Sequence, residues 1–444
     1  MKNYTLKPGM TIVTSFIIFI IIGTGLLMTP HATTDGKGTS LVDALFTSTS
    51  AVCVTGLIVQ DTPLYFSRFG HIIILILIQI GGLGIMTSYV FFSLAVRKRL
   101  LISQQVAMKG VFDTVNVGEI KKTVLFIVIS TLVIEAAGTS VLAIHWSGEP
   151  FGEDIFYSLF HSISAFCNAG FSLFSDSLAT YHNDITVTIT FGLLIVFGGV
   201  GFVVLINLFE LFTSLAGRNK NRRLNMHTKI VLTTTAILII LGAILFYTFE
   251  HEQTLSSLSV KNKIFVSVFQ SVTTRTAGFS MVDIGSLTSP TFLYFMFFMF
   301  IGGSPCSTAG GVKTTTVFVI FALVYSIFQG KEELVVYGRT IHKRIVLKAV
   351  SLLTISLLTI MLFGLILLYT EEASFKVIIF EVFSAFGTVG LSGGLTSELT
   401  PAGKITVSIL IFIGRIGPLT LALIIGRNIV ERKIRFPEGR VLVG

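Results

Sequence analysis

Four segments of the chain share one short pattern, in which small and polar residues lead to a glycine. The four glycines recur at intervals of roughly 110 residues, which is the signature of an internally repeated chain. They end the segments Ser50–Gly56, Ser164–Gly170, Val272–Gly278 and Ser384–Gly390. Four copies of one unit can be placed around a common axis, so the pattern predicts four related units that surround a pore.

The composition predicts that this axis stands in a lipid bilayer. Hydrophobic residues make up 52% of the chain and charged residues 12%, and the mean hydropathy is +0.86, well above that of a soluble domain. Apolar stretches long enough to cross a hydrocarbon core lie near residues 10–29, 71–96, 123–146, 186–213, 230–249, 291–328, 346–369 and 405–427. We therefore expect eight spanning helices, two in each unit.

Basic residues predict the orientation of these helices. They gather in the connections that follow the second helix of each unit and in the tail, and include Arg97, Lys98, Arg99, Arg218, Lys220, Lys331, Arg339, Arg432 and Lys433. By the positive-inside rule these connections and both termini are cytoplasmic. The net charge of +9 is split among short loops without interleaved aromatic residues, so no nucleic acid partner is expected.

Acidic residues mark the opposite face. Asp43, Asp184, Glu250, Glu371 and others lie in the connections that flank the repeated glycines. Such charges either form an anionic vestibule that concentrates cations before they enter, or are ordinary solvated loop charges. The three cysteines, Cys53, Cys167 and Cys306, all fall at membrane depth and are interpreted as small packing residues, with no disulfide, metal cluster or covalent cofactor.

Between the two helices of each unit lies a segment that is too short to cross the membrane. Residues 40–53 and 151–167 are examples, and each is apolar enough to enter the bilayer as a re-entrant half-helix. The predicted fold is an all-α membrane protein of four pseudo-repeated helix, pore-loop, helix units with eight transmembrane helices and four re-entrant half-helices around a central pore. The units cover residues 1–120, 121–227, 228–343 and 344–444.

The residues that precede each glycine predict a cation site built from backbone carbonyl groups. Non-helical backbone is tolerated at membrane depth only where it is buried in protein or lines a watery cavity. Glycine accepts a positive φ, which lets successive carbonyl oxygens face one direction and replace the hydration shell of a potassium ion. The predicted K+ ligands are the carbonyl oxygens of Val54, Thr55, Gly56, Asn168, Ala169, Gly170, Thr276, Ala277, Gly278, Thr388, Val389 and Gly390.

Each second helix also carries a glycine-rich element, and in the fourth unit Arg415 stands where the other units have a glycine. An intramembrane guanidinium by default faces the bundle interior or a watery cavity. We expect Arg415 below the repeated glycines and near the axis, where its charge would slow a cation or anchor a gate. A structural role remains the alternative, in which Arg415 pairs with a carboxylate or with helix-end carbonyl groups.

The corresponding element of the third unit predicts a broken helix. Residues 302–316 contain four glycines, a proline and many hydroxyl groups, which do not sustain a helix. A loop inside the membrane under the repeated glycines would serve as a gate, and a packing kink is the alternative. The predicted gate consists of Gly302, Gly303, Ser304, Pro305, Gly310, Gly311, Lys313 and Arg415.

With these features the chain resembles the Trk/Ktr/HKT superfamily of potassium transporters, and most closely the bacterial Ktr-type pore-forming subunit. The resemblance covers nearly the whole chain. It implies potassium uptake across the bacterial cell membrane, a gating loop at 302–316, an arginine constriction at Arg415 and stimulation by sodium. Gly56, at a place where sodium-selective plant members carry serine, favours potassium. The resemblance also implies a homodimer on a cytoplasmic nucleotide-binding regulatory ring. This chain has no phosphate-binding glycine loop of its own, so nucleotide sensing would come from that partner.

Two other functions remain in view. An intramembrane hydrolase would use His161, Glu135, Glu381 or Arg275, but no nucleophile or metal-ligand spacing accompanies them, and polar support behind the repeated glycines is favoured. His161 and Glu381 align with Thr47 and Phe269 in the other two units. The second is a sodium- or proton-coupled symporter with alternating access. It is disfavoured because such folds carry broken helices in matching positions, whereas we expect only one broken helix here.

Overall fold

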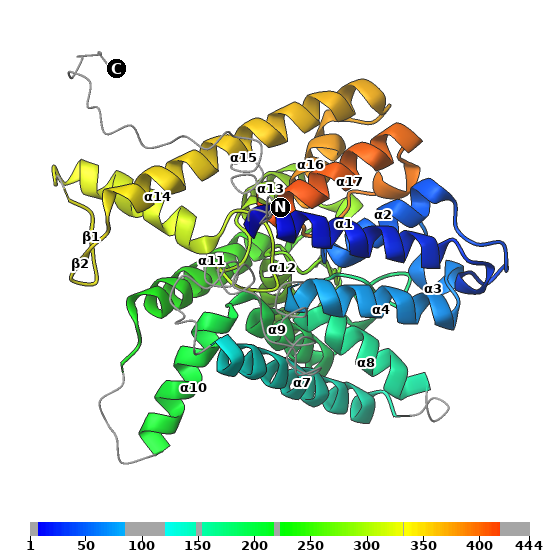
Figure 1. The fold of residues 1–444 in the computed structure, drawn as a ribbon, viewed down its shortest axis with the longest axis horizontal. Helices are drawn as coiled ribbons and strands as arrows, with labels where there is room; N and C mark the ends of the chain where they lie inside the picture. The colour runs from blue at the N-terminus through cyan, green and yellow to red at the C-terminus, as the bar shows by residue number, and fades with distance from the viewer. Residues whose placement is uncertain (1–7, 85–119, 148–152, 217–222, 332, 418–444) are drawn as a thin grey trace, which may run out of the picture.

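The chain is almost entirely helical in the computed structural model (Figure 1). The structure describes residues 8–84, 120–147, 153–216, 223–331 and 333–417. The second half of the predicted span 71–96 and the C-terminal tail lie outside these residues.

The first two units supply eight of the described helices. In the first unit these are α1 (Pro8–Leu27), α2 (Leu41–Val52), α3 (Thr62–Tyr65) and α4 (Arg68–Leu83). In the second unit they are α7 (Ile120–His145), α8 (Glu153–Phe166), α9 (Ile185–Gly199) and α10 (Phe202–Ala216).

The last two units follow the same order of elements, with a hairpin added between them. The third unit has α11 (Met226–Glu250), α12 (Val260–Thr273), α13 (Ser289–Phe300) and α14 (Thr314–Phe328), followed by β1 (Val335–Val336) and β2 (Arg339–Thr340). The fourth unit has α15 (Lys343–Thr370), α16 (Phe375–Gly387) and α17 (Pro401–Ile416). Short 3₁₀ turns are η1 (Pro30–Ala32), η3 (Ala179–Tyr181), η4 (Ile284–Ser286) and η5 (Thr396–Glu398).

The helices α2, α8, α12 and α16 precede the four glycines and are 12, 14, 14 and 13 residues long. A straight helix of this length covers about 20 Å, against roughly 30 Å for a hydrocarbon core, so none of them can cross it. We call these four the pore helices.

Among the described residues, three helices are long and apolar enough to cross a membrane, namely α7, α11 and α15. The pair α9 and α10 passes the same test together, but the two are bent by 102° at the break between Gly199 and Phe202. The expectation of only one broken helix is therefore wrong. The helix break predicted in the third unit is present, and it separates α13 from α14.

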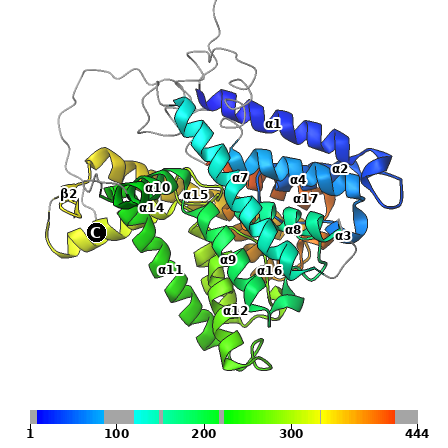
Figure 2. The ribbon, with the colours of Figure 1, turned by 90° about the horizontal axis from the view of Figure 1, so that it is seen from below.

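The units pack in a closed cycle. The second helix of each unit contacts the pore helix of the next one: α4 contacts α8, α9 contacts α12, α13 contacts α16, and α17 returns to contact α2. Figure 1 shows the blue, cyan, green and orange elements arranged in this order around a shared centre, and Figure 2 shows α10, α14 and β2 together on one side of the molecule. The four repeated segments consequently meet at that centre.

A recurring contact attaches each of the first three pore helices to its own first helix. Ser48 Oγ donates to Ile20 O at 2.8 Å, Ser162 Oγ to Glu135 O at 2.7 Å, and Ser271 Oγ to Ile239 O at 2.8 Å. Each acceptor lies three residues before a glycine that faces the same serine; these glycines are Gly23, Gly138 and Gly242. A side chain at any of the three would displace the hydroxyl group, so glycine allows the close approach.

Two carboxylates at the ends of first helices cap the helices that follow. Glu250 is fully buried and accepts hydrogen bonds from Thr288 N at 2.9 Å and Thr291 Oγ1 at 2.5 Å, at the start of α13. Glu371 accepts from Thr400 N at 2.9 Å, at the start of α17. These charges complement helix N-termini. Glu250 and Glu371 are therefore caps, and the vestibule interpretation stays open only for other acidic residues.

Candidate ion pathway

The four repeated glycines form a closed ring at the centre of the molecule. A methyl group added to Gly170 would lie 3.0 Å from Ala277 O, and one added to Gly278 would lie 2.5 Å from Val389 O. In the same way Gly390 faces Thr55 O and Gly56 faces Ala169 O. Each glycine thus abuts the carbonyl group that precedes the glycine of a neighbouring unit. We call Gly56, Gly170, Gly278 and Gly390 the glycine ring.

In each unit, the ring glycine and the residue two positions before it both have a left-handed backbone conformation. The glycines have φ angles of +90°, +69°, +79° and +94°, and the residues two positions before them are also left-handed, at +56°, +59°, +71° and +51°. These four residues are Val54, Asn168, Thr276 and Thr388. A left-handed conformation costs an L-residue about 1–2 kcal/mol, and three of these side chains are β-branched. Strain repeated at four equivalent places points to a functional requirement on the carbonyl groups.

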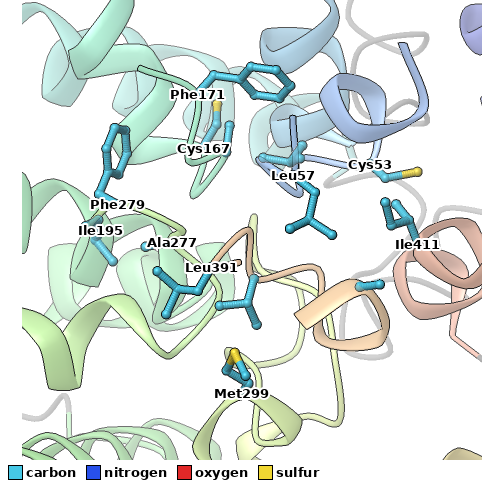
Figure 3. Close-up of a cluster of buried hydrophobic side chains, with 14 of the residues drawn as sticks. Cys53, Leu57, Cys167, Phe171, Ile195, Ala277, Phe279, Met299, Leu391 and Ile411 are labelled. Atoms are coloured by element: carbon cyan, nitrogen blue, oxygen red, sulfur yellow. The ribbon is translucent and has the colours of Figure 1, made fainter. Parts of the chain in front are cut away.

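All four pore helices end one to three residues before these left-handed residues, so their C-termini lie beside the ring. The partial negative charge of a helix C-terminus favours a cation there. Apolar packing holds the loops behind the ring, because the residue after each glycine is a buried hydrophobic one. These residues are Leu57, Phe171, Phe279 and Leu391, which Figure 3 shows on four separate segments around one centre.

Hydroxyl groups near the ends of the pore helices tie each loop back to its helix. Gly56 N donates to Ser50 Oγ at 3.1 Å, and Gly390 N donates to Ser384 Oγ at 3.1 Å. In the second and third units the hydroxyl group instead donates to the carbonyl oxygen after the glycine. There Ser164 binds Phe171 O at 2.7 Å and Thr273 binds Phe279 O at 2.5 Å.

A second polar contact braces three of the loops from behind. His161 Nε2 lies 3.1 Å from Ser172 Oγ, Gln270 Nε2 donates to Ser280 Oγ at 2.9 Å, and Glu381 accepts from Ser392 Oγ. The serine is in each case two residues after the ring glycine. We call these three contacts the polar braces, and they match the polar support expected of His161 and Glu381.

The alignment of Phe269 with His161 and Glu381 is wrong by one residue, because Gln270 takes that role in the third unit. The backbone explains the offset. Ala277 N bonds to the carbonyl group four residues earlier, that of Thr273, whereas Thr55 N bonds five residues back, to Ser50. The third pore helix therefore reaches the ring with one residue fewer. In the other three units a serine lies six residues before the ring glycine, whereas in the third unit the corresponding hydroxyl group is that of Thr273, five residues before Gly278. This offset was the signal in the sequence.

The segment between α13 and α14, residues 301–313, folds back on itself under the ring. Gly302 N donates to Val312 O at 2.9 Å, and Thr314 N to Gly303 O at 3.1 Å. Lys313 Nζ donates to Ala309 O at 2.7 Å and to Gly310 O at 3.3 Å. The lysine charge is thus bound within the segment itself, which we call the intramembrane loop.

The intramembrane loop also satisfies the broken ends of α9 and α10. Ser304 N donates to Gly199 O at 3.0 Å and Thr308 N to Gly198 O at 3.3 Å, while Phe202 N donates to Cys306 O at 2.9 Å. Carbonyl and amide groups freed at a helix break need such partners inside a membrane. The two breaks therefore stabilise each other.

On its other side the intramembrane loop touches the fourth unit directly beneath the ring. A methyl group on Gly311 would lie 3.4 Å from Gly387 Cα, and one on Gly310 would overlap Thr388 Oγ1. Thr388 is one of the left-handed residues of the ring. At these two glycines the loop contributes no side chain, so its backbone lies directly against the Thr388 side chain and the Gly387 backbone.

Arg415 joins three units. Its Nη1 donates to Thr308 O of the intramembrane loop, and its Nη2 donates to Gly81 O, in the last turn of α4, at 2.6 Å. Both expected roles draw support from this geometry, since Arg415 lies at the loop below the ring and also binds a helix-end carbonyl group. The importance of Thr308, which contacts Arg415, Gly198 O and Phe166 O, was not evident from the sequence.

The candidate catalytic residues do not form a common site. Glu135 accepts from Gln79 Nε2 at 3.2 Å, and Arg275 donates to Thr235 Oγ1 at 3.3 Å. His161 and Glu381 act in separate polar braces. Within the described ranges, no group of three or more His, Cys, Asp or Glu side chains could hold a metal ion. The oxygen atoms nearest to the ring glycines are instead the backbone carbonyl oxygens of Thr55, Ala169, Ala277 and Val389.

Comparisons with known proteins agree with this architecture. Residues 2–431 match the family model described as TrkH, cation transport protein. The chain is 40% identical to Ktr system potassium uptake protein B of Bacillus subtilis (strain 168), over 98% of this chain and 97% of that protein. It is 35% identical to potassium/sodium uptake protein NtpJ of Enterococcus hirae, over 99% and 98%. The crystal structure of the potassium transporter TrkH from Vibrio parahaemolyticus matches with a TM-score of 0.71, 18% identity, and coverage of 93% and 85%.

Proposed function

Because the chain belongs to the TrkH family of cation transport proteins, we propose that it takes up potassium ions across the bacterial plasma membrane through the glycine ring. The family is one of transporters and not of enzymes. Two relatives are named potassium uptake proteins, that of Bacillus subtilis and one of Vibrio alginolyticus at 39% identity. The observation that carries the proposal is the cyclic approach of each ring glycine to a carbonyl group of a neighbouring unit.

The glycine ring acts as a selectivity filter. The carbonyl oxygens of Thr55, Ala169, Ala277 and Val389 replace water around a dehydrated potassium ion, assisted by the carbonyl groups of the residues on either side. The C-termini of four pore helices add favourable potential at the same point. Polar braces and buried apolar residues resist collapse of the ring toward a smaller ion.

The intramembrane loop and Arg415 form the gate. The loop lies under the ring, and Arg415 binds it through Thr308 O, so that a cation leaving the ring meets both a physical obstruction and a positive charge. Opening requires the loop to move away from Gly198 and Gly199 of the second unit and from Arg415 of the fourth. The mutual hydrogen bonds of the two helix breaks hold the closed arrangement.

In the complete assembly we infer eight transmembrane helices, four re-entrant pore helices and two cytoplasmic termini, in a homodimer seated on a cytoplasmic nucleotide-binding ring. The basic loops predict this orientation. The cytoplasmic partner senses the nucleotide, because this chain has no phosphate-binding loop of its own. Sodium is a stimulating ion in this proposal and not a bound cofactor.

A coupled symporter with alternating access is the second candidate. The bend between α9 and α10 gives it new support, because two neighbouring units now carry breaks at equivalent elements. Uptake that stops when a sodium or proton gradient is removed, at constant membrane potential, would favour the symporter. A channel-like pathway continues under the same conditions.

Gly278→Ser tests the proposed filter. The added side chain would meet Val389 O on a left-handed backbone, so we expect lower selectivity for potassium over sodium. Gly25→Ser is the matched control, because nothing lies within 4 Å of a methyl group there. Rubidium and sodium uptake would be measured in cells without other potassium systems. Unchanged affinity for both ions in Gly278→Ser contradicts the proposal.

A further inference from the structure

A cavity of about 430 Å³ lies beside α14 and the β1–β2 hairpin, well away from the glycine ring. Its size falls within the range of small-molecule binding sites. The lining is largely aromatic and aliphatic, with one basic side chain, and includes Phe318, Phe321, Ala322, Tyr325, Lys331 and Tyr337. Figure 1 shows α14 and the hairpin projecting to one side of the molecule.

The cavity lies beside a small buried core and has an exposed apolar wall. Val319, Leu334, Ile341 and Ala349 form a small buried core that fixes the hairpin to α14 and α15. By contrast, the wall of α14 is uncovered, since Phe321 and Tyr325 are 61% and 65% exposed. Tyrosine side chains such as that of Tyr325 gather where the hydrocarbon core meets the headgroups.

Positive charge lies along the rim of the cavity. Lys331 lines it, and Lys229 Nζ lies 5.6 Å from the centre of the Tyr337 ring. Tyr337 is fixed there by a contact of 3.3 Å between its hydroxyl group and Thr233 Oγ1. Further basic residues follow at Arg339 in β2 and at Lys343 and Arg344, where α15 begins. The described acidic side chain in the hairpin, Glu333, accepts a hydrogen bond from Thr340.

We propose that this cavity is a binding site for an anionic phospholipid, with one acyl chain against α14 and the phosphate held by Lys229 and Lys331. Basic pockets between membrane helices on the cytoplasmic side suit acidic headgroups. A second copy of this chain is a poorer occupant, because a symmetric contact would place the same basic rim against itself. The apolar wall and the basic rim together fit a ligand that is apolar at one end and negative at the other.

Tryptophan fluorescence tests the proposal without any transport measurement. The chain has one tryptophan, Trp146, so W146F gives a background in which F321W places a single indole in the cavity wall. The full-length protein would be reconstituted with brominated phosphatidylglycerol or brominated phosphatidylcholine. We expect the phosphatidylglycerol to quench F321W at a lower mole fraction, with the preference falling about fivefold for each of K229Q and K331Q.

L358W in the same background is the matched control, because Leu358 is 61% exposed on α15 and does not line the cavity. Both lipids should quench it equally, with or without the lysine substitutions. Equal quenching of F321W by both lipids would overturn the proposal. Protection of F321W from both lipids would also overturn it, and would assign this face to a protein surface.

Discussion

Lys404 and Asp43 form an ion pair, with Nζ 2.7 Å from Oδ1, that joins the fourth unit to the first. The two side chains are 15% and 14% exposed, and Gln60 Nε2 donates to the other carboxylate oxygen at 3.3 Å. The contact between α17 and α2 closes the cycle of units. This ion pair therefore stabilises the cycle at the place where the fourth unit meets the first.

Lys404→Met should therefore destabilise the protein, because it leaves a largely buried carboxylate without its cation. A lost partner of this kind costs about 1–3 kcal/mol. The midpoint of thermal unfolding in detergent would fall, and the double variant with Asp43→Asn should recover part of the loss. A double variant that is less stable than Lys404→Met would show that the pair does not act as a unit.

Arg415→Ala should raise rubidium uptake at equal protein abundance, because it removes a positive charge and the hydrogen bond to Thr308 O. An increase of roughly tenfold would correspond to about 1.4 kcal/mol of barrier. Arg415→Lys retains the charge and is the comparison that separates repulsion from hydrogen bonding. Uptake that is equal or lower in Arg415→Ala would remove Arg415 from the barrier.

Shortening the intramembrane loop by deleting Gly310 and Gly311 should leave the pathway open when the cytoplasmic partner is absent. The deletion removes the loop's contacts beneath Gly387 and Thr388. Rubidium uptake would be compared with and without the regulatory ring, in a strain that lacks other potassium systems. Tight closure of the shortened protein would place the gate elsewhere.

Gln270→Leu should reduce selectivity for potassium over sodium severalfold, because it breaks the polar brace to Ser280 while keeping the size of the side chain. Removing one partner of a buried hydrogen bond is worth about 1–3 kcal/mol, which is ample to deform one loop of the ring. Gln270→His, the residue type that the second unit uses, should restore selectivity. Wild-type selectivity in Gln270→Leu would show that the ring does not need this brace.

The sequence predicted those features that repeat. The spacing of four glycines anticipated their convergence, and the glycines and proline of 302–316 anticipated a helix break, because both follow from local conformational preference. The bend after Gly199 was missed because its sequence resembles that of an ordinary glycine-rich helix contact. The loop's hydrogen bonds to Gly198 and Gly199 come from another unit, and no local pattern reveals them.

The role of Gln270 was missed for a related reason. Counting back a fixed number of residues from Gly278 assumes that every pore helix joins its loop alike, whereas in the third unit the stretch from the brace residue to the ring glycine is shorter by one residue. The position of Arg415 in the repeat predicts that it lies below the ring, and its contact with Thr308 O of the intramembrane loop is consistent with that prediction. Its partner Gly81 O, 334 residues away, is set by the closure of the cycle and could be found only in the folded chain.

The central claim is that backbone oxygens of the glycine ring coordinate the transported ion. Crystals of the protein grown in rubidium would test it through anomalous scattering. We predict a peak on the axis, surrounded by the carbonyl oxygens of Thr55, Ala169, Ala277 and Val389. A rubidium peak coordinated by side chains away from this axis, with none inside the ring, would contradict the account.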